Sequence, residues 1–194
     1  GGCASRPGMA YPSIVGRMLD WPTINLGFSG NGKSEPEMAN LMAELDPAAY
    51  VLDSLPNLQP DEVAQRVEPF IRTLRKAHPD TPIILVENVV YTNAEMVASR
   101  SNYKDKNAHL TTIYEKLRNE GDRKLYYVAG DDQQDACDVY RRDGAHPTDL
   151  GFLRMAEAIA PVVRPVLPYP TRNRFRAASS RSTHAAPPPS RAKR

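Results

Sequence analysis

The chain has 194 residues, of which 41% are hydrophobic and 25% are charged, which suits one α/β domain with a single core. No run approaches the roughly 18 consecutive apolar residues that a membrane span needs, and no signal-like segment opens the chain, so no membrane partner is expected. The net charge of +2 conceals a basic end: seven of the 25 basic residues and no acidic one lie in 171–194, which leaves 18 basic against 23 acidic groups in 1–170.

Four short runs of aliphatic and β-branched residues predict strands, at 23–28, 49–53, 83–87 and 125–128. The segments between and after them, at 35–45, 61–78, 93–120 and 148–163, repeat apolar residues at helical spacing, and Asp61 is expected to cap the second. Strands that alternate with such helices predict a parallel sheet covered on both faces. The residues expected to face the core are Met38, Leu41, Met42 and Leu45; Val63, Val67, Phe70, Ile71 and Leu74; Leu110, Ile113, Tyr114 and Leu117; and Leu150, Leu153, Ala156, Ile159 and Val163.

The composition changes from residue 165 onward, where Pro, Arg, Ser and Ala dominate without an apolar period. We therefore predict one folded domain over residues 1–166, followed by a basic, disordered tail at 167–194. The basic residues of the tail are not interleaved with aromatic residues and no nucleic-acid-binding motif accompanies them, so no nucleic acid partner is expected.

Three polar motifs stand at the ends of predicted strands or just before the last helix. They read NLGFSGNG at 25–32, DSLPN at 53–57 and DGAHP at 143–147. Open α/β sheets bind ligands at the carboxyl ends of their strands. Each motif alone is typical of an ordinary turn or surface pair, whereas all three in this order indicate an active site.

This order resembles the SGNH hydrolases, a superfamily of GDSL-like esterases whose blocks are a Ser, a Gly, an Asn and a D-x-x-H. The resemblance covers residues 1–166 and is closest to a subgroup whose first block reads Gly-Thr-Ser-Ile and then GGCASRPGMAY, which stands here at 1–11. By position, Gly30 corresponds to the glycine, Asn57 to the asparagine, and Asp143 and His146 to the acid and base. The resemblance implies a flavodoxin-like three-layer α/β/α sandwich and a carboxylic-ester hydrolase.

The chemistry of these residues suits that activity. The tetrahedral oxyanion of ester hydrolysis needs fixed donors, which the Gly30 N–H and the Asn57 amide can supply. His146 would take the serine proton and return it to the leaving alcohol, while Asp143 would fix the imidazole tautomer. Capping of the helix that begins near Pro147 is the alternative role for Asp143. No metal or organic cofactor is needed or indicated.

The nucleophile is the main departure from the family pattern. In the subgroup it lies in the Gly-Thr-Ser-Ile segment, a few residues before the position of Gly1. Both that segment and the central first strand that leads into it are expected to be missing from the chain. Ser5 is the nearest serine; it is interpreted as the N-cap of a helix that starts at Pro7, with a catalytic role as the alternative. Glu87 and Asn88 end a strand on the expected active face and are candidates to line the substrate site.

Two hypotheses follow. In the first, the chain is an esterase or acylesterase domain for a small-molecule or carbohydrate ester, its serine lies upstream, and the chain alone is inactive. In the second, it is an inactive remnant or binding module of the same fold. Three further polar residues are interpreted as structural or solvated, namely Ser29, His78 and His109.

Overall fold

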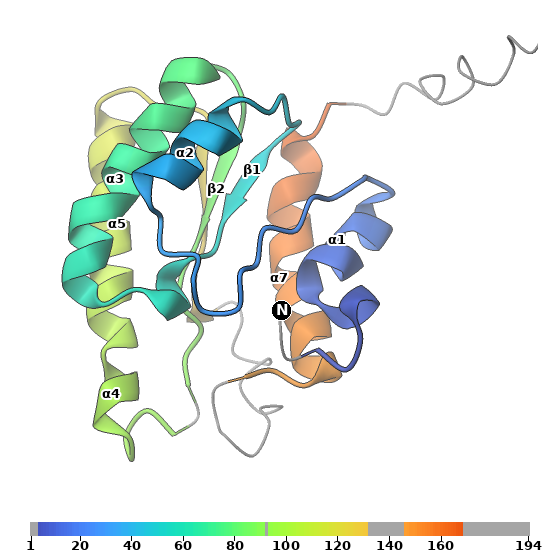
Figure 1. The fold of residues 1–194 in the computed structure, drawn as a ribbon, viewed down its shortest axis with the longest axis vertical. Coiled ribbons are helices and arrows are strands. Elements are labelled where there is room, and N and C mark those ends of the chain that lie inside the picture. The colour runs from blue at the N-terminus through green and yellow to red at the C-terminus, as the bar shows by residue number, and fades with distance from the viewer. Residues whose placement is uncertain (1–3, 92, 132–145, 169–194) are drawn as a thin grey trace, which may run out of the picture.

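The computed structural model describes residues 4–91, 93–131 and 146–168 (Figure 1). Strands and α-helices alternate along this part of the chain, and short 3₁₀ turns flank several of them. The elements are η1 (Pro7–Met9), α1 (Tyr11–Leu19), α2 (Pro36–Ala43), β1 (Tyr50–Leu52), η2 (Leu55–Asn57), α3 (Pro60–Ala77), β2 (Ile83–Val86), α4 (Ala98–Ser101), α5 (Tyr103–Asn119), β3 (Leu125–Val128), α7 (Asp149–Val163) and η4 (Arg164–Val166).

The sheet is parallel, with the strand order β1-β2-β3. Tyr50 pairs with Ile83, and Ile83 pairs with Leu125, so the three strands start in register. All of β2 is buried, as an apolar central strand of a parallel sheet should be. The predicted strands at 49–53, 83–87 and 125–128 are confirmed.

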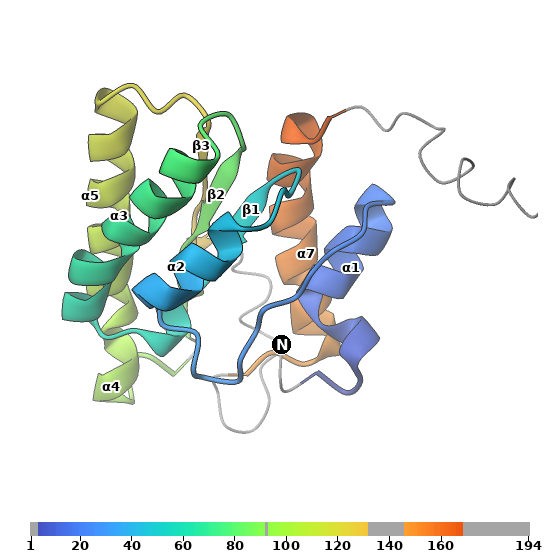
Figure 2. The same cartoon turned by 45° about the horizontal axis from the view of Figure 1, so that its top comes forward.

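Helices cover both faces of the sheet (Figures 1 and 2). On one face lie α2, α3 and α5, where Ile71 packs in one core cluster with Leu85. On the other face lie α1 and α7, where Phe152 and Ile159 pack in a second cluster with Ile84. The expected α/β class, with a parallel sheet between two helical layers, is confirmed.

The segment 23–28 is not a strand, and that prediction is wrong. It joins α1 to α2 without regular structure, and Ile24 is 73% exposed. A strand needs a neighbour for its backbone hydrogen bonds, and this segment pairs with none of the described strands. Leu26 and Phe28 are exposed as well, as is Val51 on the neighbouring edge strand β1.

The start of α3 differs from the prediction in its cap. Gln59 is the N-cap: its side chain accepts the backbone N–H of Glu62, and its own N–H donates to the Glu62 carboxylate at 2.8 Å. Pro60 occupies the first helical position, where its missing N–H costs nothing. Asp61 is therefore not the cap; it lies in the first turn, where a carboxylate complements the helix dipole.

Several helix predictions need smaller corrections. α2 ends at Ala43, and Leu41 is 56% exposed because the smaller Ala39 takes the buried position against the core. Leu45 follows the helix and is also exposed, as is Leu150 in the first turn of α7. The segment predicted as one helix at 93–120 contains a turn, then α4 and α5. The other residues expected to face the core are buried or partly buried.

Some predictions concern residues outside the described part of the chain. Asp143 is one of them, and so is the segment 169–194, which makes up most of the expected tail. Among the helices that are described, none is both long enough and apolar enough to cross a membrane.

Candidate active site

The carboxyl ends of the parallel strands meet at one edge of the sheet, at the bottom of Figure 1. β1 leads into Asp53 and η2, β2 leads into Glu87, and β3 leads towards Gly130. His146 lies just before α7, whose first turn is at the same end of the molecule. The fold thus brings the described parts of the three motifs to the edge where parallel sheets bind ligands.

The glycine turn and Asn57 are joined by a hydrogen bond. Gly30 has a φ of +88°, which favours glycine, and a side chain built there would meet no atom within 4 Å. The Asn57 amide Nδ2 donates to the backbone oxygen of Gly32 at 3.1 Å. Leu55 and Leu58 on either side of this amide are buried and hold η2 in place. One amide hydrogen of Asn57 is engaged in this bond, and an amide carries two.

His146 is exposed at the approach to α7. Thr148 caps this helix, since its side chain accepts the Gly151 N–H at 3.3 Å. Thr148 thus holds the N-cap position, and the alternative role expected for Asp143 lies outside the described residues. The expected pairing of Asp143 with His146 lies outside the described residues and stays a prediction.

Ser5 binds the first turn of α7 instead of capping a helix. Its backbone N–H donates to the Asp149 carboxylate at 3.0 Å, and its hydroxyl donates to the same carboxylate. The turn that starts at Pro7 has Arg6 as its N-cap and no side-chain cap, so the capping prediction for Ser5 is wrong. The hydrogen bond from the Ser5 hydroxyl joins the N-terminal segment to α7.

Glu87 and Asn88 hold the loops at the ends of β2 and β3. The Glu87 carboxylate accepts the Gly130 N–H at 2.6 Å and the Tyr127 hydroxyl at 2.5 Å. Asn88 is fully buried, and its amide donates to the Val89 oxygen at 2.7 Å. These contacts give both residues a structural role. The substrate-lining role expected for them stays a prediction.

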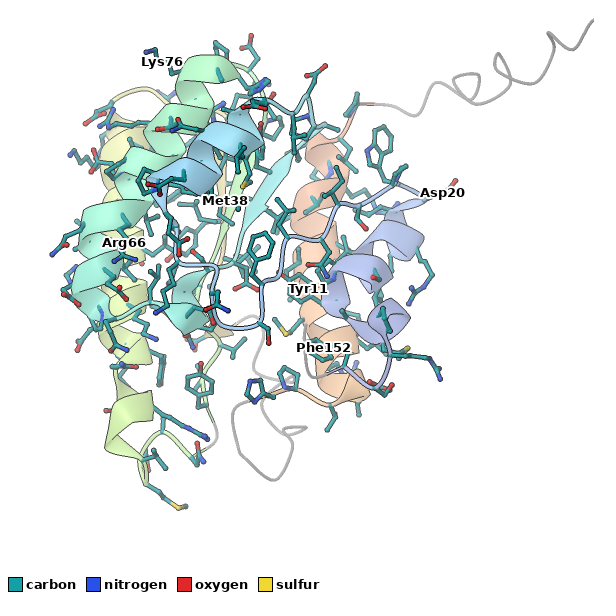
Figure 3. The ribbon with its side chains drawn as sticks, viewed as in Figure 1. Tyr11, Asp20, Met38, Arg66, Lys76 and Phe152 are labelled. Atoms are coloured by element: carbon teal, nitrogen blue, oxygen red, sulfur yellow. The ribbon has the colours of Figure 1, made fainter. Side chains whose placement is uncertain are left out.

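A polar pair that no sequence motif indicated, Tyr11 and Asp53, also lies at this edge. The Tyr11 hydroxyl donates to the Asp53 carboxylate at 2.8 Å, and Figure 3 shows Tyr11 on the side of α1 that faces the sheet. Burial raises the pKa of Asp53 to about 6, although the Tyr11 hydrogen bond opposes the shift. Burial and the neighbouring Asp53 raise the pKa of Tyr11 as well. An acid with a shifted pKa at a ligand-binding edge is a functional candidate.

One local signal pointed to Asp53, because it follows a predicted strand directly. Nothing pointed to Tyr11, which lies 42 residues away in the chain. The three residues interpreted as structural or solvated fit that interpretation. The His78 ring nitrogen Nε2 lies 2.9 Å from the Ala43 oxygen, Ser29 has a left-handed φ of +51° in the glycine turn, and His109 is exposed on α5.

The described groups offer hydrogen-bond donors, an imidazole and a half-buried acid at one edge. This set can bind an oxyanion and move a proton, which are the two needs of acyl transfer. Within the part of the chain that the structure describes, no three His, Cys, Asp or Glu side chains group in a way that could hold a metal ion.

Three solved structures show what this chain is similar to. A protein from Bacteroides ovatus ATCC 8483, described as a GDSL-like lipase, is 38% identical and superposes with a TM-score of 0.75 over 84% of this chain and 49% of its own. The salicylyl-acyltransferase SsfX3 from a tetracycline biosynthetic pathway is 20% identical, with a TM-score of 0.69 over 84% of this chain and 50% of its own. A family 3 carbohydrate esterase from Talaromyces cellulolyticus is 12% identical, with a TM-score of 0.59 over 81% and 91% of the two chains.

The chain spans about half the length of the first two of these proteins. The two likenesses below 25% identity establish the fold alone. Among curated proteins, none matches the sequence. The sequence does match the GDSL-like Lipase/Acylhydrolase family over residues 1–164, from its first residue into η4. The chain therefore belongs to the GDSL-like lipase/acylhydrolase family.

Proposed function

We propose that this chain forms the body of a carboxylic-ester hydrolase with a Ser-His-Asp type mechanism and an oxyanion hole made by Gly30 and Asn57. One observation carries the proposal: the Asn57 amide donates to Gly32 O at 3.1 Å, within two residues of Gly30. Both expected oxyanion donors thus belong to one hydrogen-bonded unit at the ligand-binding edge. Membership of the GDSL-like family and the fold of known esterases support it.

In this mechanism a serine oxygen attacks the acyl carbon of the ester, and its proton passes to the neutral imidazole of His146. The carbonyl oxygen becomes an oxyanion that accepts the Gly30 N–H and the Asn57 amide. The imidazolium then gives its proton to the leaving alcohol as the carbon–oxygen bond breaks. A water molecule, deprotonated by His146, hydrolyses the acyl-serine and releases the acid. Asp143 fixes the imidazole tautomer and stabilises the imidazolium.

The serine of this mechanism lies upstream of the chain, in a segment like Gly-Thr-Ser-Ile. Two observations on the described residues support this assignment. The hydroxyl of Ser5, the nearest serine, is committed to Asp149. β1 is also an edge strand among the described strands, and Val51 on it is 36% exposed, which is compatible with pairing to a further strand. We therefore expect residues 1–194 by themselves to be inactive.

The proposed substrate is a small-molecule or carbohydrate ester. The related folds include a carbohydrate esterase and an acyltransferase, and both kinds of enzyme handle an acyl group bound to oxygen. The second candidate function is a binding module of the same fold without catalysis. The bond from the Ser5 hydroxyl to Asp149 is compatible with this candidate too, because it leaves the described residues without Ser5 as a nucleophile.

The experiment compares residues 1–194 with the same chain extended at its N-terminus by a strand that leads into a Gly-Thr-Ser-Ile segment. Both are assayed with p-nitrophenyl acetate and with a fluorophosphonate probe for activated serines. The extended protein should hydrolyse the ester and react with the probe, since intact sites commonly accelerate reactions at least about 10⁶-fold. Residues 1–194 should retain at most about the 10³–10⁴-fold acceleration over water that survives the loss of a triad member.

Two variants of the extended protein test the oxyanion hole. Asn57→Ala should lower kcat about 10²–10³-fold. Asn119→Ala, a matched change at the exposed end of α5, should leave the rate unchanged. Failure of the extended and correctly folded protein to hydrolyse any simple ester would favour the binding module.

A further inference from the structure

A pocket of about 590 Å³ lies between the segment after β2 and the start of α5. Tyr91 and Met96 line it from the first side, and Tyr103 and Lys104 line it from the second. We call it the Tyr91 pocket. Small-molecule sites usually measure about 300–1,000 Å³, so its size suits one. Tyr91 follows β2 by five residues, which puts the pocket at the same edge of the sheet as the candidate active site.

The aromatic wall of the pocket is held in place by its neighbours. The rings of Tyr91 and Tyr103 meet edge to face, with centroids 6.4 Å apart and planes at 87°. The Arg100 guanidinium lies over the Tyr91 ring, 5.9 Å from its centroid, and also donates to Asn93 Oδ1 at 2.8 Å. A wall fixed in this way needs little reordering when a ligand binds.

The remaining lining is part apolar and part charged. Met96 is 87% exposed, although a methionine ordinarily packs inside. Glu95 and Lys104 are exposed beside it, one carrying acceptors and the other donors. A ligand with apolar faces and several hydroxyl groups would satisfy both kinds of lining. An alkyl chain would desolvate the two charged groups without giving them partners.

Tyr91 also connects the pocket to the polar pair found at the end of β1. Its hydroxyl lies 3.5 Å from Asn88 Oδ1, on the residue that follows Glu87. Burial, with the charge of Asp53 as a further cause, raises the pKa of Tyr91, so this phenol lies within electrostatic reach of Asp53. Tyr91 therefore lines the pocket and also interacts electrostatically with Asp53.

We propose that the Tyr91 pocket binds a sugar ring, whose C–H faces contact Tyr91, Tyr103 and Met96 and whose hydroxyls bind Glu95 and Lys104. In the proposed ester hydrolase this ring is the alcohol part of the substrate, and that assignment rests on the proposed function. Binding of the ring itself requires no nucleophile. It can therefore be measured on residues 1–194.

The experiment titrates ¹⁵N-labelled protein with cellobiose and, separately, with hexanoate as an acyl-chain probe. Cellobiose should shift the amide signals of Ala94, Met96, Tyr103 and Lys104, with a dissociation constant on the order of 1 mM. Tyr103→Ala should weaken binding about fivefold or more, and Met96→Ala should weaken it to a smaller degree. Leu41→Ala, which removes another exposed apolar side chain on the distant helix α2, should have no effect.

Two results would overturn the proposal. The first is that hexanoate, and not cellobiose, shifts these amide signals. The other is the absence of sugar-dependent shifts in a protein with the parent's circular dichroism. The outcome is separate from that of the ester assay: hydrolysis of p-nitrophenyl acetate without sugar binding refutes the pocket alone, and sugar binding without hydrolysis refutes the enzyme alone.

Discussion

Replacing Asp53 by asparagine should make the protein more stable at neutral pH. Asp53 is a half-buried acid at the end of β1, and its carboxylate accepts the Tyr11 hydroxyl at 2.8 Å. An asparagine oxygen can accept the same hydrogen bond without carrying a charge. The substitution therefore keeps the contact and removes the cost of a buried carboxylate.

The magnitude follows from the shift of the pKa of Asp53 from 3.8 to about 6. Between these values the folded protein binds this proton more tightly than the unfolded chain, so the free energy of unfolding falls as pH rises through the window. At about 1.4 kcal/mol per pKa unit, the free energy of unfolding has fallen by at most about 3 kcal/mol once the pH is above about 6. Partial access of water to Asp53 makes the real effect smaller.

The assay is urea unfolding of the parent and of Asp53→Asn at several pH values from about 4 to about 8. The stability gained by the variant should grow across the window from about 4 to about 6 and then stay constant. Asp80→Asn, in the exposed turn before β2, is the matched control and should gain nothing. Parallel curves for the parent and Asp53→Asn over the whole range would refute the reasoning.

Three other predictions concern stability. Arg75→Met should lower the free energy of unfolding by at least about 2 kcal/mol in a denaturant titration, because Arg75 is only 19% exposed and binds Asp122 and several loop carbonyls. Arg72→Met removes an exposed ion pair and should lower it by less than about 1 kcal/mol. Gly130→Ala should lower the free energy of unfolding by about 1–3 kcal/mol, since the new Cβ would lie 2.6 Å from the backbone oxygen of Asn88. Gly8→Ala should lower it far less, because its Cβ would lie 3.7 Å from the nearest atom, on Arg17. Removal of 171–194 should leave the melting temperature unchanged, because this segment has too little apolar surface to offset its ordering entropy; a fall of several degrees would show that it packs on the domain.

The parts of the fold that sequence reasoning predicted are those fixed by local pattern. The apolar run at β2 and the repeat of Val67, Ile71 and Leu74 on α3 each indicate burial within a few residues of chain. The run at 23–28 shows the limit of that signal. Its apolar residues suit a strand, but a strand also needs a partner, and the sequence of the segment carries no information about one.

The candidate site likewise contains residues that stand in a local motif and residues that only tertiary packing brings together. Gly30, Asn57 and His146 could be proposed from the sequence because each stands in a short motif. The Tyr11–Asp53 pair could not, because it joins residues 42 positions apart through a contact that only the packing of α1 creates. The cap of α3 lies between these cases: Pro60 and Glu62 both point to position 59, but glutamine is not among the residues usually found at an N-cap.

The proposed mechanism depends above all on His146 as the base of an ester hydrolase. The most direct test is the rate of p-nitrophenyl acetate hydrolysis by the protein extended with the Gly-Thr-Ser-Ile strand, compared between the parent and His146→Ala. His109→Ala, which changes an exposed histidine on α5, is the matched control, and all three proteins should have the same circular dichroism. His146→Ala should lower kcat by a factor on the order of 10³ or more, while His109→Ala should retain the parent's rate. Full activity of His146→Ala would contradict it.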